Sequence, residues 1–295
     1  MGNGIVILDG GMSRELERLG APFRQPEWSA LALMETPEIV EKAHVEFIEA
    51  GAEVITTNNY AVVPYHIGEK RFADEGRRLI ELSGKLARSA ADRKKGVRVA
   101  GCVPPVFGSY RPKEFDPVRA PKILAEIVGG LAGVADLWLV ETTSSIAEME
   151  AAVAATVAAP KPLWVALTLE DGSAEDDGSR LRSGESVREA CAAALSQDID
   201  AVLFNCSTPE IMSRAIDEAR RILPESVRIG VYANGFARPA GQRGAKRDIT
   251  PMRKDLDPAA YLALARQWRE HGASIIGGCC GIGCSHIEAL SKGLD

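Results

Sequence analysis

Residues 137–169 read L-W-L-V-E-T-T-S-S-I-A-E-M-E-A-A-V-A-A-T-V-A-A-P-K-P-L-W-V-A-L-T-L, and this stretch decides the fold. Two short runs dominated by apolar residues, Leu137–Glu141 and Leu163–Leu169, flank a longer alanine-rich segment, Ser145–Ala158. Strands that are buried on both faces have continuous apolar runs, and such strands are typical of parallel sheets covered by helices. The stretch therefore predicts a strand, a helix and a second strand parallel to the first.

The same alternation extends along the whole chain. The other expected strands are Ile5–Asp9, Val54–Asn58, Val97–Cys102, Ala201–Cys206, Arg228–Ala233 and Ser274–Cys279. The other expected helices are Pro37–Ala50, Phe72–Lys95, Pro121–Ala135, Glu185–Gln197, Pro209–Leu223 and Pro258–His271, with a shorter helical pattern at Arg14–Leu19. Thr36 and Asp257 each precede a proline and are expected to cap a helix, and Gly51 and Gly272 are expected to end one.

Eight strand–helix units predict an α/β fold, a (β/α)8 TIM-type barrel that forms a single domain over residues 1–295. A doubly wound open sheet is the alternative. Such a sheet usually carries G-x-G-x-x-G after its first strand, and the sequence Asp9-Gly10-Gly11-Met12 lacks that pattern. The polar stretches Glu170–Glu185 and Phe236–Asp257 each follow a strand, where barrels place functional loops.

Composition narrows the class of protein. The chain is 46% hydrophobic, so we do not expect it to be disordered. Its net charge is −6, so we do not expect a negatively charged partner such as nucleic acid or an anionic membrane. Six cysteines in 295 residues are too few for a disulfide scaffold. With no targeting or membrane-spanning pattern, we expect a cytoplasmic protein with reduced thiols. No oligomeric state follows from the sequence.

Three cysteines stand at the ends of expected strands. Cys206 ends the sixth strand, and Cys279 and Cys280 follow the eighth. The side chains of neighbouring residues on a strand point to opposite faces. Cys279 and Cys280 can therefore both reach one point only if glycines 277, 278 and 281 turn the chain there. Three converging thiolates suit Zn(II) with a fourth position open, as in catalytic sites. The alternative is that these cysteines are small core residues.

The remaining cysteines have simpler interpretations. We expect Cys102 and Cys191 to pack in the core, and Cys284 to be a packing residue or a spare thiol.

Two carboxylates are expected at the same end of the barrel. Asp9 ends the first strand and Glu141 ends the fourth, where they could bind a substrate ammonium group. A glycine turn at Gly10 and Gly11 leads through Met12 into a helix, whose free N–H groups could bind a substrate carboxylate. An ammonium group, a carboxylate and a thiol together describe a thiol amino acid.

Several motifs, in this order along the chain, resemble those of the homocysteine S-methyltransferase family. They are D-G-G-M-S-R-E-L at 9–16, P-E-W-S-A at 26–30, T-T-N-N-Y at 56–60, V-E-T at 140–142, N-C-S at 205–207, V-Y-A-N-G at 231–235 and I-I-G-G-C-C-G at 275–281. The resemblance spans about residues 4–290. N-C combined with G-G-C-C-G is its most specific part.

The resemblance implies a zinc-dependent methyltransferase that forms methionine from homocysteine. By its motifs, Cys206, Cys279 and Cys280 match the metal ligands, Asp9 and Glu141 match contacts to the homocysteine amino group, and Tyr60 matches a tyrosine near the metal. Trp28 matches an aromatic residue of the betaine pocket in relatives. Thr142, however, replaces the aromatic residue that betaine-using members carry after the glutamate, and Cys284 replaces a common proline.

Chemistry and chain length narrow the methyl donor. A free thiol is only a few per cent thiolate at neutral pH, and Zn(II) would deprotonate it. The 295 residues leave no room for a cobalamin module or a folate-binding barrel, so a small donor is expected. S-methylmethionine or S-adenosylmethionine is favoured over betaine because of Thr142. Tyr65, Phe107 and Tyr110 could face a methylsulfonium group, although packing within their loops is the simpler interpretation.

Other functions remain open on the sequence alone. The acceptor could be another thiol or a selenol. A non-catalytic zinc- or redox-sensing barrel could use the same cysteines, and an unrelated barrel enzyme could bury them in its core. The basic cluster Arg238–Arg253 could be a solvated loop or a lid.

Overall fold

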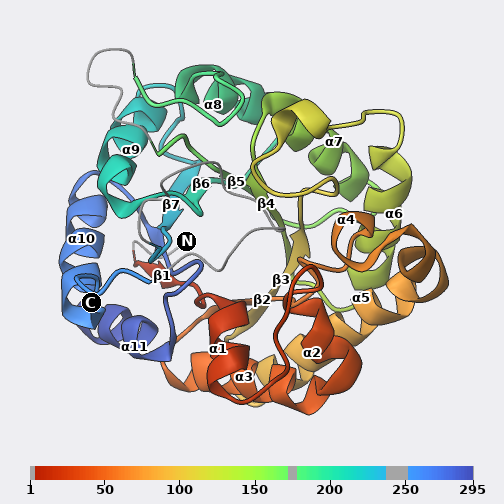
Figure 1. Cartoon of the computed structure of the whole chain (residues 1–295). Helices are drawn as coiled ribbons and strands as arrows, with labels where there is room; N and C mark the ends of the chain where they lie inside the picture. Colours follow the sequence, from red (N-terminus) through yellow and green to blue (C-terminus); the bar gives the residue numbers. More distant parts are fainter. Residues whose placement is uncertain (1–3, 172–177, 237–251, 295) are drawn as a thin grey trace.

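Eight parallel strands form a barrel that a ring of helices surrounds in the computed structural model (Figure 1). The structure describes residues 4–171, 178–236 and 252–294. The strands are β1 (Val6–Ile7), β2 (Val54–Thr56), β3 (Arg98–Val103), β4 (Leu137–Thr143), β5 (Leu163–Leu167), β6 (Ala201–Asn205), β7 (Arg228–Tyr232) and β8 (Ile275–Ile276). Their order is β1-β8-β7-β6-β5-β4-β3-β2. A parallel bridge between Leu8 and Val54 joins β1 to β2, so the sheet closes and the predicted barrel is confirmed.

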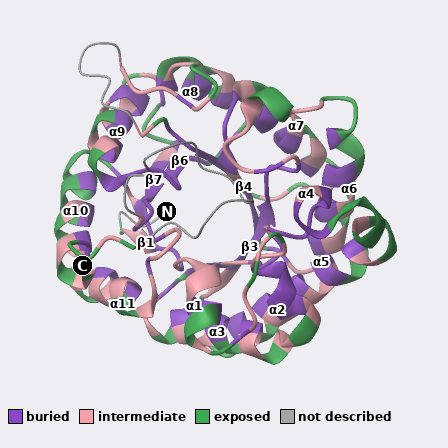
Figure 2. Cartoon of the chain, viewed as in Figure 1, coloured by how far each residue is buried: buried purple, intermediate pink, exposed green. Residues whose placement is uncertain are grey.

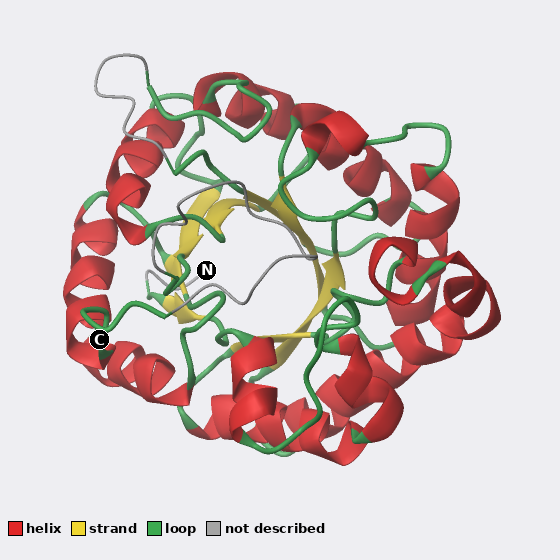
Figure 3. Cartoon of the chain, viewed as in Figure 1, coloured by secondary structure: helices red, strands yellow, loops and turns green. Residues whose placement is uncertain are grey.

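The helices lie outside the strands and separate consecutive ones (Figure 3). The longer ones are α3 (Pro37–Glu49), α5 (Glu69–Ala91), α6 (Ala120–Leu131), α7 (Ile146–Thr156), α8 (Val187–Leu195), α9 (Met212–Arg220), α10 (Pro258–Glu270) and α11 (Cys284–Gly293). The shorter ones are α1 (Met12–Arg18), α2 (Ala30–Glu35) and α4 (Pro64–Ile67), with 3-10 turns at Pro112–Glu114 and Pro209–Ile211. None of the helices in these described ranges is long and apolar enough to cross a membrane.

Two apolar clusters explain why the strands read as continuous hydrophobic runs. Leu137 and Leu139 of β4 point into the barrel, whereas Trp138 and Val140 of the same strand pack against the surrounding helices. Because both faces of the sheet are covered, buried residues occupy the strands and the inner helix faces, and exposed residues lie on the outer helix faces (Figure 2).

Some of the expected boundaries are wrong. β8 ends at Ile276 instead of Cys279, β1 covers only Val6–Ile7, and the helix expected at Pro209–Leu223 begins with a 3-10 turn. Thr36 precedes α3 but makes no capping hydrogen bond. Asp257 does cap α10, since its carboxylate accepts the Ala260 amide at 2.8 Å.

Candidate active site

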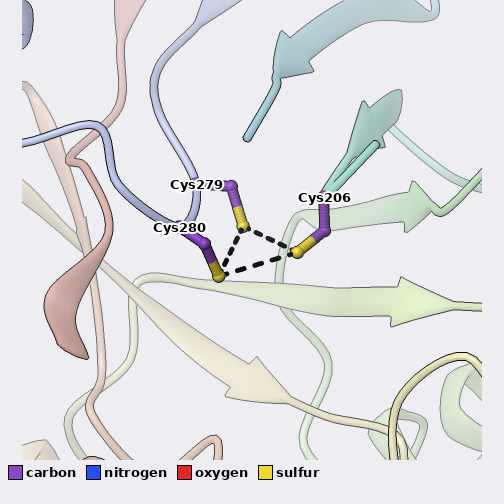
Figure 4. Close-up of side chains that lie close together, drawn as sticks. All are labelled: Cys206, Cys279 and Cys280. Atoms are coloured by element: carbon purple, nitrogen blue, oxygen red, sulfur yellow. Dashed lines mark hydrogen bonds between the residues drawn. The ribbon is translucent and has the colours of Figure 1, made fainter. Parts of the chain in front are cut away.

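The three strand-end cysteines converge at one point, as the sequence predicts (Figure 4). The sulfur of Cys206 lies 3.1 Å from that of Cys279 and 3.9 Å from that of Cys280, and the Cys279 and Cys280 sulfurs are 4.0 Å apart. Cys206 is buried, and the other two are half-buried. The closed barrel brings the carboxyl ends of β6 and β8 together, although their cysteines are far apart in sequence.

Glycines allow the chain to turn after β8. A Cβ atom at Gly277 would lie 2.4 Å from the Cβ of Leu8, so only glycine permits this approach to β1. Gly281 has a φ of 84°, in the left-handed region that glycine adopts without strain. Cys279 and Cys280 therefore follow irregular backbone, and both side chains reach the same point.

Cys206 also leaves strand geometry. Its φ is 53°, a left-handed conformation that is unusual for a residue with a side chain. Such strained residues often occur at functional sites, where the surrounding structure holds them in place. The expected strand Ala201–Cys206 consequently ends one residue early, at Asn205.

The two strand-end carboxyl groups lie in the same pocket as the cysteines. Asp9 accepts hydrogen bonds from the amide (2.7 Å) and the hydroxyl (3.2 Å) of Thr56. Burial raises its pKa to about 8, and the nearby charge of Glu141 adds to that shift. Burial likewise raises the pKa of Glu141 to about 7, although a hydrogen bond from Cys102 opposes this. An ammonium group entering between them would stabilise both ionised forms.

All of the predicted site residues line this single pocket: Asp9, Gly11, Met12, Trp28, Tyr60, Glu141, Cys206, Cys279 and Cys280. The Tyr60 hydroxyl lies 2.6 Å from the Ser109 hydroxyl. The Gly11 amide donates to the carbonyl of Ile282 at 2.8 Å, so it is not one of the expected free N–H groups. A substrate carboxylate bound at the start of α1 would have to accept hydrogen bonds from the later amides, from Met12 onward.

Sequence reasoning missed two contacts in the pocket. The Tyr110 hydroxyl lies 2.6 Å from the Cys206 sulfur, so packing within its loop is the wrong interpretation for this residue. Cys102 is buried as expected, but its thiol also donates to the Glu141 carboxylate at 3.2 Å. Its place on β3 next to β4 is the only signal that could have indicated that contact.

Other expectations concern residues outside the pocket. Phe107 is not part of its wall, in keeping with loop packing, and Cys191 is fully buried in α8. Tyr65 also lies outside the wall, but it belongs to α4, so its expected place in a loop is wrong. Most of the basic cluster Arg238–Arg253 lies outside the described residues. Arg253 at its end binds Glu210 and, at 2.7 Å, Asp255.

Cys284 belongs to a second group of possible ligands, with Glu15 and Glu46. The guanidinium group of Arg18 already binds both carboxylates, with an Nε distance of 2.7 Å to Glu15. The Cys284 thiol donates to Glu15 at 3.3 Å. This group is therefore an ion-pair cluster in which Arg18 already occupies both carboxylates.

Known proteins are similar to this chain over nearly its whole length. Residues 6–294 match the family described as Homocysteine S-methyltransferase. The chain is 31% identical to Homocysteine S-methyltransferase 1 of Zea mays over 98% of its own length and 94% of the relative. It is 30% identical to the enzyme of the same name from Brassica oleracea var. italica, with 99% and 94% covered.

A solved structure is similar as well. The metallated form of the homocysteine methyltransferase MmuM from Escherichia coli matches with a TM-score of 0.79 and 26% identity, covering 98% of this chain and 96% of that one. A barrel with this thiol-lined pocket and these relatives is an enzyme of the methyltransferase class. More particularly, the chain belongs to the homocysteine S-methyltransferase family. This membership decides against an unrelated barrel enzyme and against a barrel without catalytic activity.

Proposed function

We propose that this enzyme moves a methyl group from a small sulfonium compound, S-methylmethionine or S-adenosylmethionine, to the sulfur of homocysteine, and that it uses Zn(II) held by Cys206, Cys279 and Cys280. The observation that carries the proposal is the convergence of the three thiols in a pocket that also contains Asp9 and Glu141.

The donor atoms fit zinc. Thiolates bind Zn(II) at about 2.3 Å, so two sulfurs of a tetrahedral site lie roughly 3.8 Å apart. The distances from Cys280 to the other two sulfurs, 3.9 and 4.0 Å, agree with that spacing. The third distance, 3.1 Å between the Cys206 and Cys279 sulfurs, would have to lengthen when zinc binds. When bound, zinc would lower the pKa of the acceptor thiol and keep it as a nucleophilic thiolate.

The protein's own residues orient the acceptor. Asp9 and Glu141 would bind the homocysteine ammonium group, and their fixed positions would direct its thiol toward the three cysteines. Thr56 holds the Asp9 carboxylate with two hydrogen bonds, and Cys102 holds Glu141 with one. Orientation of this kind removes much of the entropic cost of bringing two substrates together.

Aromatic rings favour a positively charged donor. Trp28, Tyr60, Tyr110, Tyr232 and Phe236 all line the pocket. Ring faces attract cations, and the attraction grows when water is excluded. A sulfonium group loses its positive charge as the methyl group leaves, so a dry pocket favours the reaction. Thr142 stands where betaine-using relatives carry an aromatic residue, so a quaternary ammonium donor has less support.

A donor screen tests the proposal. Zinc-loaded enzyme is incubated with homocysteine and, separately, S-methylmethionine, S-adenosylmethionine or betaine, and methionine is measured by mass spectrometry. We expect methionine with at least one sulfonium donor, little with betaine, and none with Cys206→Ala. Turnover with betaine alone would contradict the donor assignment. Full activity of Cys206→Ala would contradict the zinc site.

A further inference from the structure

The phenol of Tyr110 makes a contact that methyl transfer alone does not explain. Its oxygen lies 2.6 Å from the Cys206 sulfur, within hydrogen-bonding distance. Tyr110 comes from the loop after β3, whereas Cys206 directly follows β6. With a φ of 64°, Tyr110 has a left-handed backbone conformation, as Cys206 does. Two residues from distant strands are thus held in unusual conformations while their side chains meet.

Arg182 holds the ring of Tyr110. Its guanidinium carbon lies 4.4 Å from the ring centroid, a cation–π arrangement. The guanidinium group also donates to Asp171 at 2.9 Å and to the Thr168 hydroxyl at 3.2 Å. The Arg182 side chain is only 13% exposed, so water screens these interactions weakly.

The contacts form a closed ring around Cys206. The other carboxylate oxygen of Asp171 accepts the amide of Thr208 at 2.8 Å, two residues after Cys206. The path therefore runs from the Cys206 sulfur through Tyr110, Arg182 and Asp171 and returns to the backbone beside Cys206. A closed set of contacts of this kind, in which hydrogen bonds and one cation–π contact support each other, fixes the position of a side chain more firmly than one contact would.

We propose that Tyr110 is a positioning residue whose hydroxyl donates a hydrogen bond to the Cys206 sulfur, and that Arg182 fixes the ring for this purpose. The inference rests on the proposed function, in which Cys206 is a zinc ligand. A hydrogen bond to a thiolate ligand takes up part of its negative charge and orients its lone pairs. Partners of metal ligands typically contribute about 10- to 100-fold to metal affinity or activity.

The matched variants are Tyr110→Phe and Tyr65→Phe. The first removes only the hydroxyl that meets Cys206. The second removes the hydroxyl of a residue in α4 that does not line the pocket. Zinc affinity is measured by competition with a chromophoric chelator. The cobalt-substituted proteins report the sulfur-to-metal charge-transfer band, which a purely structural change would leave in place.

We expect Tyr110→Phe to bind zinc about 10-fold or more weakly and to move the charge-transfer band to longer wavelength, because sulfur without its hydrogen bond gives up electrons more easily. Tyr65→Phe should match the wild type in both measurements. Arg182→Met should change the zinc affinity and the charge-transfer band in the same directions as Tyr110→Phe does, but by a smaller amount. Melting temperatures check that each variant is folded.

Two outcomes separate this inference from the proposed function. A wild-type protein that binds zinc, together with a Tyr110→Phe protein of equal affinity and unshifted band, would overturn the role of Tyr110 alone. A wild-type protein that binds no zinc would overturn the proposed function, and this inference with it.

Discussion

Asp9 is buried and Glu141 is half-buried in the same pocket, and both have pKa values far above those of free carboxyls, with the charge of Glu141 adding to the shift of Asp9. This arrangement costs stability in the absence of a cation, because burial disfavours the ionised forms. Such costs are common where a site is built for a charged substrate. The pair therefore fits recognition of an ammonium group.

Replacing Glu141 with glutamine tests that recognition. We expect the KM for homocysteine to rise about 10- to 100-fold, since hydrogen bonds to charged groups contribute about 1.5–3 kcal/mol. Initial rates over a range of homocysteine concentrations measure the effect. Glu148→Gln is the control, because Glu148 is also buried with a pKa raised to about 7, but binds the Ser144 amide outside the pocket wall. Equal KM values for the two variants would contradict the assignment.

The raised pKa of Asp9 also predicts how stability depends on pH. Between the ordinary carboxyl pKa of 3.8 and the folded value of about 8, the native protein retains a proton that the unfolded chain has lost. Stability from this group is therefore greatest at low pH and falls as pH rises through that range, by on the order of a few kcal/mol. Asp9→Asn should reduce this dependence.

Urea unfolding of the metal-free, reduced protein at pH 5.5 and pH 8 measures that effect. The wild type should lose more unfolding free energy between these pH values than Asp9→Asn does. The same loss in both proteins would show that Asp9 does not carry the proton.

At the scale of elements, the turn after β8 determines whether the site forms. Gly277→Ala would place a Cβ atom 2.4 Å from that of Leu8 and 3.0 Å from the Asp9 carbonyl oxygen. We expect a loss of about 1–3 kcal/mol in stability, as for other overpacked positions, and a lower zinc content because Cys279 and Cys280 are displaced. Chemical unfolding and metal analysis test both effects.

Gly133→Ala is the matched control, because an added Cβ atom there meets nothing within 4 Å. Its stability should stay within about 0.5 kcal/mol of the wild type. If Gly277→Ala had the same stability and zinc content as this control, the site would not require the close approach of Gly277 to Leu8.

The sequence predicts the central strands well and the ends of elements less well. The apolar run from Leu137 makes β4 evident, whereas β8 is shorter than its expected range because it ends at Ile276, before Gly277 and Gly278. α11 has no side-chain cap at its start, so helix-start chemistry could not predict it. These differences arise where tertiary contacts, rather than local preferences, set the backbone.

At the scale of the molecule, the barrel brings together residues that no local pattern relates. Alternation of strands and helices predicts the closed sheet, and strand-end positions predict that Cys206 and Cys279 meet. The contact of Tyr110 with Cys206 could not be predicted in this way, because a loop residue's position depends on partners such as Arg182. Topology therefore predicts the main groups of the site, and loop packing adds the groups that position them.

The most direct test of the account is the number of sulfur atoms around zinc, measured by X-ray absorption spectroscopy on the purified enzyme. We predict three sulfurs at about 2.3 Å without substrate and four after homocysteine is added, since the fourth position would take the acceptor thiol. A sulfur count that stays the same when homocysteine binds, or that is below three in the resting enzyme, would contradict the account.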